Sequence, residues 1–159
     1  MKRSSIVLLV ALVSSVPTRG RAVVARPTRA QCTINAVARG GEWALSLQID
    51  NGRAPLALPY FAPVMLGQLV VRREGVRLSL AEPAVDMAVQ SRTLRLAPNA
   101  RVEVPVVHRL RFRPASGPLL SSDRFVITID HPRAEVSLGA TFGQGPNALD
   151  CRGVLRPAP

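Results

Sequence analysis

Apolar and polar residues alternate strictly along the segment WALSLQI, from Trp43 to Ile49, and this period of two constrains the fold more than any other feature of the chain. Side chains of an extended strand point alternately to its two faces, so the pattern predicts a strand with one buried face. No segment after residue 25 shows the 3.6-residue period of an amphipathic helix. The expected buried face consists of Trp43, Leu45, Leu47 and Ile49.

Turn-forming residues divide the rest of the chain into further extended segments. Asp50-Asn51-Gly52, Glu74-Gly75 and Pro98-Asn99-Ala100 predict tight turns, and a hairpin is expected around His131-Pro132-Arg133. Proline cannot donate to a central ladder, so Arg53–Pro63 is expected to be an extended or edge segment and Pro105 to lie at an edge or bulge. The remaining predicted strands are 31–37, 69–73, 76–81, 93–97, 101–113, 124–130, 134–142 and 151–155.

Eight or nine short strands separated by turns are typical of an all-β protein. The chain has 159 residues, which suits one domain. We therefore expect a single antiparallel β-sandwich over residues 26–159, with 156–159 as a loose tail and a β-barrel as the alternative.

The N-terminus has the pattern of a secretory signal peptide. Lys2 and Arg3 precede the apolar run Ile6–Val13, which is too short to span a bilayer. Residues 1–25 are the expected signal, with cleavage near positions 22–25. The sequence thus predicts export to the periplasm or the medium, with no transmembrane segment in the mature chain.

Cys32 and Cys151 are the two cysteines, and they lie at opposite ends of the predicted domain. An even cysteine count in an exported chain favours a disulfide. Neither cysteine has a partner at zinc-ligand spacing, so we expect a disulfide that closes the domain.

The order of four segments resembles bacterial immunoglobulin-like sandwich modules. These are the strand that ends in Asp50-Asn51-Gly52, the proline-rich edge segment, the hairpin, and the step LRLAPNARVEVPV (Leu94 to Val106). The same stretch, within Trp43–Phe112, is similar to the intracellular proteinase inhibitor family typified by BsuPI. The first resemblance implies an immunoglobulin-like sandwich, and the second implies protease inhibition.

Arginine dominates the charge, because 21 Lys+Arg stand against 10 Asp+Glu and Lys2 is the only lysine. A GC-rich genome would give the same excess, so composition alone does not assign a role. Several arginines do alternate with apolar residues on predicted strands and should share a face. They are Arg77, Arg95, Arg109, Arg111 and Arg113, the candidate anion-binding residues.

Catalytic and metal-binding patterns are weak. His108 lies on the apolar face of the long strand, where a satisfied core histidine is the simpler interpretation. His131 follows Asp130, but the sequence shows neither a nucleophile elbow nor an oxyanion loop beside it. The five Asp residues lack calcium-loop spacing. We expect no catalytic site, no metal and no cofactor.

The expected function is that of a non-enzymatic binding or structural module that contacts a protein partner. Recognition is expected at Ala54–Pro63 and at the loop Gly143–Asp150, because irregular segments on a rigid scaffold commonly carry binding. Three alternatives remain open. One is a binder of lipopolysaccharide or acidic polysaccharide through the arginine face. Another is a protease inhibitor that presents Arg73 or Arg92. The third is a hydrolase that depends on His131.

Overall fold

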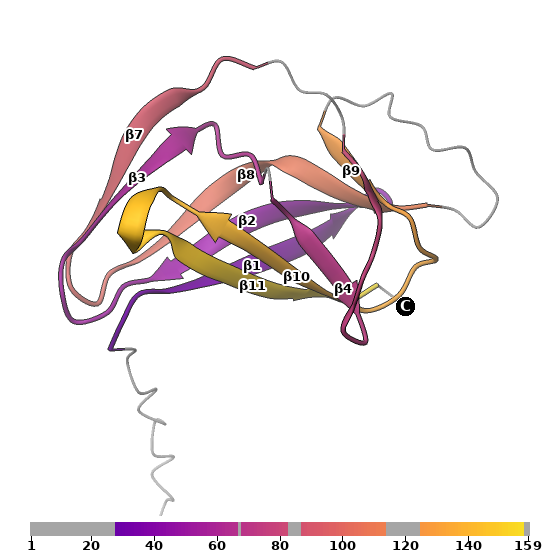
Figure 1. Cartoon of the computed structure of the whole chain (residues 1–159), viewed down its shortest axis with the longest axis horizontal. Helices are drawn as coiled ribbons and strands as arrows, with labels where there is room; N and C mark the ends of the chain where they lie inside the picture. Colours follow the sequence, from indigo (N-terminus) through magenta and orange to yellow (C-terminus); the bar gives the residue numbers. More distant parts are fainter. Residues whose placement is uncertain (1–27, 67, 83–86, 114–124, 158–159) are drawn as a thin grey trace, which may run out of the picture.

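A computed structural model describes residues 28–66, 68–82, 87–113 and 125–157. Within these ranges the protein is all-β, as predicted, with eleven strands and one short 3-10 helix, η1 (Gly145–Asn147) (Figure 1). The predicted signal peptide, residues 1–25, lies outside the described residues. The strands are β1 (Gln31–Arg39), β2 (Glu42–Asp50), β3 (Leu56–Ala62), β4 (Val70–Arg73), β5 (Val76–Arg77), β6 (Leu80–Ala81), β7 (Gln90–Leu96), β8 (Arg101–Phe112), β9 (Val126–Ile129), β10 (Val136–Phe142) and β11 (Leu149–Leu155).

Nine of these strands form one sheet in the order β5-β4-β10-β11-β1-β2-β8-β9-β6, and β3 pairs with β7 in a second sheet. The large sheet is mixed rather than antiparallel throughout, because β1 pairs with β11 and β8 pairs with β9 in parallel. Parallel neighbours need a long connection instead of a tight turn. This requirement is why the pairing could not be read from turn signals.

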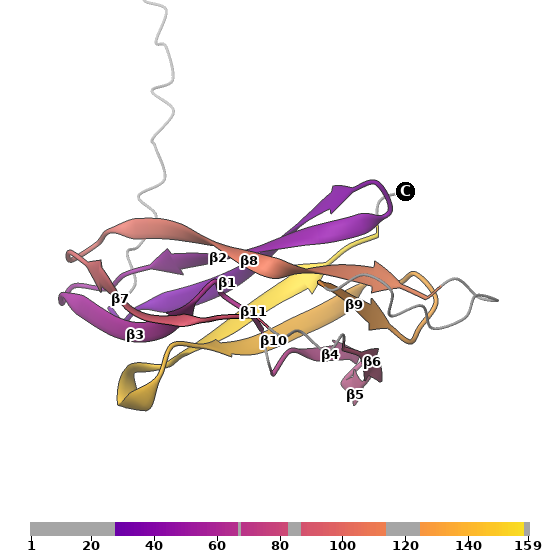
Figure 2. The same cartoon turned by 90° about the horizontal axis from the view of Figure 1, so that it is seen from above.

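The large sheet curls so that its two edges approach each other. The edge strands β5 and β6 are consecutive in the chain, and the same short segment bonds to both sides of the sheet. The Leu78 N–H donates to the Val71 carbonyl at 2.9 Å, and the Asp130 N–H donates to the Ser79 carbonyl at 3.0 Å. Figure 2 shows β4–β6 over one end of the curled sheet and the β3–β7 pair over the other. The result is a half-open barrel or sandwich.

One predicted hairpin is wrong. The residues around His131 were expected to join adjacent strands, but β9 pairs with β8 and β6, whereas β10 pairs with β4 and β11. Residues 131–133 therefore connect two strands, β9 and β10, that lie on opposite sides of the curled sheet. The hairpin at Glu74-Gly75 is confirmed, since both residues have positive φ and join β4 to β5.

The predicted apolar face of β2 forms the centre of the core. Trp43, Leu45, Leu47 and Ile49 are each at most 4% exposed. Pro105 lies at a register shift between β2 and β8, which confirms the expected irregularity at this position. The Trp43 and Phe112 rings meet edge to face with centroids 5.3 Å apart, an arrangement that stabilises beyond area burial.

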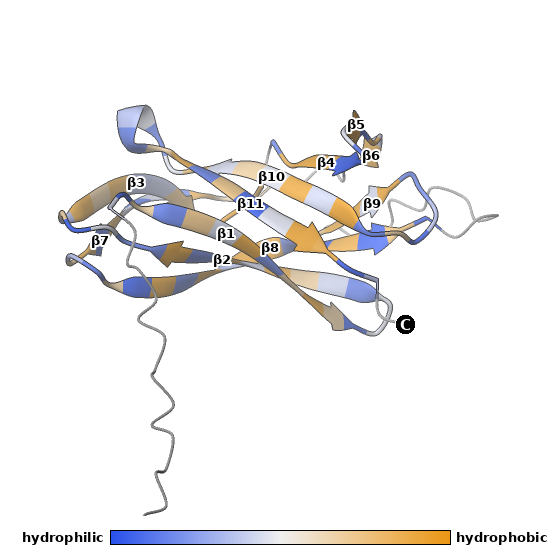
Figure 3. Cartoon of the chain, turned by 90° about the horizontal axis from the view of Figure 1, so that it is seen from below, coloured by the Kyte–Doolittle hydropathy of each residue, from blue (hydrophilic) through white to orange (hydrophobic). Residues whose placement is uncertain are grey.

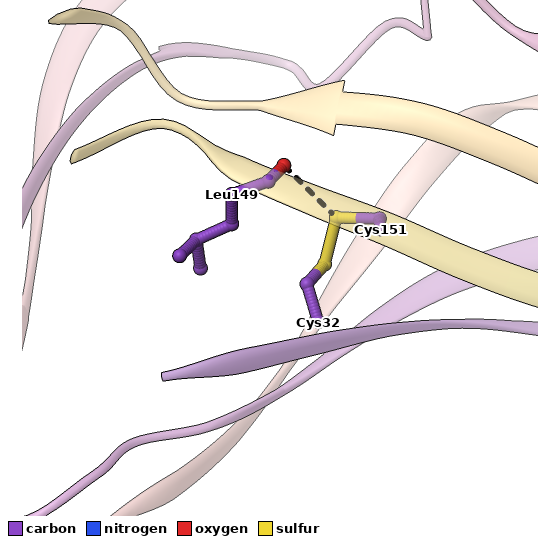
Figure 4. Close-up of a disulfide and its surroundings, with 3 residues drawn as sticks. All are labelled: Cys32, Leu149 and Cys151. Carbon is purple, nitrogen blue, oxygen red and sulfur yellow. Dashed lines mark hydrogen bonds between the residues drawn. A yellow bond between two sulfur atoms is a disulfide. The ribbon is translucent and has the colours of Figure 1, made fainter. Parts of the chain in front are cut away.

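The expected disulfide joins Cys32 on β1 to Cys151 on β11 (Figure 4). These residues are direct register partners in the parallel pair β1–β11, and their Cα atoms are 4.5 Å apart. The bridge therefore connects two central strands of the sheet that lie 119 residues apart in the chain.

Asn51 organises the end of the molecule where β3 begins. Its side chain is 4% exposed, and its Nδ2 donates to the carbonyls of Ala54 and Ala97 at 2.9 and 2.8 Å. Its Oδ1 accepts from the Gly52 N–H at 2.9 Å. A single amide thus links the end of β2, the start of β3 and the turn between β7 and β8.

Candidate functional site

The two segments predicted to carry recognition lie side by side. The Gln144 N–H, in the loop that leads to η1, donates to the Pro59 carbonyl of β3 at 2.9 Å. Tyr60 of β3 packs against Phe142, the last residue of β10, with ring centroids 5.3 Å apart. The proline-rich strand and the loop therefore form one continuous surface at one end of the domain (Figure 1).

Gly143 holds the loop in this position for two independent reasons. Its φ of 89° is in the left-handed region, which side chains with a Cβ rarely adopt. An added Cβ would also lie 2.4 Å from Cδ1 of Leu58, a fully buried residue of β3. The chain can therefore turn tightly from β10 against the back of β3 only at a glycine.

An apolar pocket of about 250 Å³ opens between β3, the end of β10 and the segment that follows β3. Phe61 is 48% exposed and Val89 is 41% exposed at its rim, both high values for large apolar side chains. We call it the edge pocket. It is lined by Tyr60, Phe61, Pro63, Val64, Met65, Val89, Thr141, Phe142, Gly143 and Gln144.

Beside this pocket, the backbone N–H and C=O groups of Thr141 point away from β11, in the plane of the sheet and beyond the end of β4. The carbonyl of Val71 accepts from the Leu78 N–H, so it points away from β10. Backbone groups alternate in direction along a strand, so those of Val70 and Arg72 point towards β10, where their register partners are Gly139 and Ser137. Thr141 continues this alternation, but β4 begins at Val70 and does not reach it. Among the described strands, the register partner of Thr141 lies on β11 alone.

The structure does not gather the five candidate anion-binding arginines into one field. Arg77 is on the edge strand β5, and Arg95 is on β7 in the second sheet. Arg109 and Arg111 both pair with Glu42, whose side chain is only 13% exposed, and Arg109 Nη1 lies 3.0 Å from Glu42 Oε2. Arg113 pairs with Asp130 at 3.0 Å. The charge of the β8 arginines is therefore partly balanced within the protein.

His108 is 7% exposed, and its Nδ1 accepts a hydrogen bond from the Leu66 N–H at 3.3 Å. Burial lowers the pKa of His108, and the charge of Glu82 opposes that shift only in part. The neutral ring therefore fixes the crossing segment after β3 against β8, in agreement with the structural role predicted for it.

His131 is also held by its surroundings. Its Nδ1 lies 2.8 Å from the Pro132 carbonyl, an acceptor, so the proton is on Nδ1, and Nε2 accepts from Arg73 Nη1 at 3.2 Å. Arg73, one of the two candidate inhibitor arginines, is therefore engaged here and with Glu74. Arg92, the other, lies within β7 opposite Tyr60.

No group of three or more His, Cys, Asp or Glu side chains in the described ranges is arranged to hold a metal ion. The same ranges contain no helix of sufficient length and apolarity to cross a membrane. Comparison of the chain with protein-family models, with curated proteins and with solved structures finds no match.

Two components of the edge pocket carry no signal in the sequence. Val89 precedes β7 in a stretch without pattern, and the exposed edge at Thr141 arises because β4 is short. Only the pairing of strands distant in the chain reveals either of them.

Proposed function

We propose that this protein is an exported, non-enzymatic binding module that takes an extended segment of a partner protein beside the edge of β10. The observation that carries the proposal is the outward-pointing backbone of Thr141 next to the edge pocket. An unpaired strand edge offers main-chain hydrogen bonds to an incoming strand, and a neighbouring pocket selects its side chains.

The chemistry of the edge pocket specifies the contact. Its rim carries two apolar residues that are exposed to water, Phe61 and Val89, and burial of such surface drives association. The partner segment should therefore bring an apolar side chain into the pocket while its backbone bonds to Thr141. The disulfide fits an oxidising compartment, as the proposed export requires.

The test is affinity capture from an envelope extract with three forms of the oxidised protein immobilised at equal density. Phe61→Ser removes the apolar rim. Val37→Ser is the matched control, because Val37 is 56% exposed on β1 and does not line the pocket. We expect the wild type and Val37→Ser to retain one protein through a wash at about 1 M salt, where exposed charges are screened.

Phe61→Ser should lose that protein. Equal retention by all three forms, or retention that disappears from the wild type at high salt, would contradict the proposal.

A further inference from the structure

We propose that a second site, on the outer face of β4, β10 and β11, binds a phosphate or sulfate monoester group. A hollow of about 630 Å³ lies over these strands. We call it the arginine hollow. It is lined by Val70, Arg72, Ser137, Leu138, Gly139, Arg152, Gly153 and Val154. Figure 3 shows the three strands side by side, with hydrophilic segments on β4 and β11.

The register places Arg72 and Arg152 on either side of β10. Arg72 lies opposite Ser137, and Arg152 lies opposite Gly139, so the two guanidinium groups flank a strand that carries only small residues there. A Cβ added to Gly139 would meet no atom closer than 3.9 Å, so the space above this glycine is open. A ligand between the two arginines would therefore rest on the backbone of β10.

A third arginine adjoins the same place. Arg77 on β5 is the direct register partner of Arg72, and both side chains are exposed on the same face. Like charges directly opposite on neighbouring strands repel. No ion pair joins Arg72, Arg77 or Arg152 to an acidic group in the described part of the chain. An anion would relieve this repulsion.

The number of donors favours an oxyanion with three terminal oxygens over a carboxylate with two. Each guanidinium presents five N–H donors in a planar fork, which suits the oxygens of phosphate or sulfate. Glu82 and Asp150 line an adjoining hollow together with Arg72, Arg77 and Arg152, so three arginines stand against two carboxylates there, and neither carboxylate lines the arginine hollow itself. The arginine hollow itself is therefore lined by two arginines and by no carboxylate.

The test is a titration of the oxidised, ¹⁵N-labelled protein with sodium phosphate at pH 7.5, against sodium chloride of equal ionic strength. We expect the Gly139 and Arg152 amide resonances to shift and saturate with phosphate, with a dissociation constant on the order of 1 mM, typical of a few exposed charge contacts. They should respond little to chloride.

Arg72→Gln and Arg152→Gln should each weaken phosphate binding by about fivefold. Arg95→Gln is the control, because it changes the net charge equally on a strand of the second sheet that does not line the hollow, and it should change affinity by less than about twofold. Gly139→Val fills the hollow without altering charge, and it should abolish the saturable shifts while the wild-type spectrum is otherwise kept.

Glucose 6-phosphate and dihexanoyl phosphatidic acid distinguish the source of the group. Tighter binding of either than of phosphate supports a saccharide or a lipid source, and equal binding supports recognition of the oxyanion alone. Shifts that follow ionic strength without saturation, or an equal loss in Arg95→Gln, would overturn the proposal.

Discussion

The N–H of Gln144 donates to the carbonyl of Pro59 at 2.9 Å, and through this bond a loop and a strand more than 80 positions apart in the chain form one wall of the edge pocket. The bond uses a backbone carbonyl of β3 on the side away from β7. It therefore satisfies part of an edge that would otherwise pair with another chain. The edge of β10 at Thr141, next to it, receives no such cover from the described strands.

Replacement of Gly143 by Ala should destabilise the protein by about 3 kcal/mol, because the left-handed backbone and the collision with Leu58 act together. Gly145→Ala is the matched control. Its φ is 76°, but an added Cβ would meet nothing within 4 Å, so we expect a cost of about 1 kcal/mol. Urea unfolding measures both, and equal costs would show that Leu58 yields without penalty.

Asn51→Ala should cost about 2 kcal/mol, since the carbonyls of Ala54 and Ala97 and the N–H of Gly52 lose the buried Asn51 amide as their hydrogen-bond partner. Asn147, which is exposed on η1, provides the comparison, and Asn147→Ala should change stability by less than about 0.5 kcal/mol. The free energies of unfolding come from the same urea series. If Asn51→Ala were as mild as Asn147→Ala, the amide would not hold this end of the domain together.

Stability should fall as the pH drops below about 6.5. Burial depresses the pKa of His108 in the folded protein, so between the folded and the unfolded pKa the unfolded chain binds a proton that the folded chain does not. That difference makes the free energy of unfolding increase with pH over this window. Thermal unfolding between pH 5 and 8 should show the slope in the wild type, and His108→Gln should flatten it. A slope unchanged in His108→Gln would assign the titration to another group.

Loss of the disulfide should be severe. The chain-entropy model gives an upper value of about 5 kcal/mol for a bridge between residues 119 positions apart. Cys32→Ser together with Cys151→Ser should therefore unfold at much lower urea than the oxidised wild type. Reduction of the wild type by dithiothreitol should give the same urea midpoint as the double variant. A double variant as stable as the oxidised protein would show that strand pairing alone closes the domain.

The sequence predicts where the strands lie in the chain better than it predicts which strands pair with one another in the sheet. The alternation in β2, the turn at Glu74-Gly75 and the irregularity at Pro105 are local signals, and the structure confirms each of them. The hairpin around His131 is wrong because a turn signal does not identify the strands that it joins. The predicted count of eight or nine strands falls below the eleven of the described residues, since the predicted strand 76–81 divides into β5 and β6 and the proline-rich segment contains β3.

The candidate sites show the same limit. The sequence predicts recognition at the irregular segments 54–63 and 143–150, and the structure brings them together without a sequence signal for that contact. The arginines of β8 alternate as expected, but whether they pair with Glu42 depends on the register of β2 against β8. The arginine hollow likewise depends on the placement of β4 beside β10, which joins segments about 65 residues apart.

The most direct test of strand addition at β10 is amide hydrogen exchange at Thr141, measured by NMR on the free protein and on its complex with the protein retained in the capture experiment. An unpaired N–H at a strand edge exchanges readily, whereas an N–H in a ladder is protected. We predict that binding slows exchange at Thr141 by at least about tenfold and leaves Arg95 on β7 unchanged. Unaltered exchange at Thr141 in a complex that Phe61→Ser abolishes would contradict strand pairing and would leave only a side-chain contact at the edge pocket.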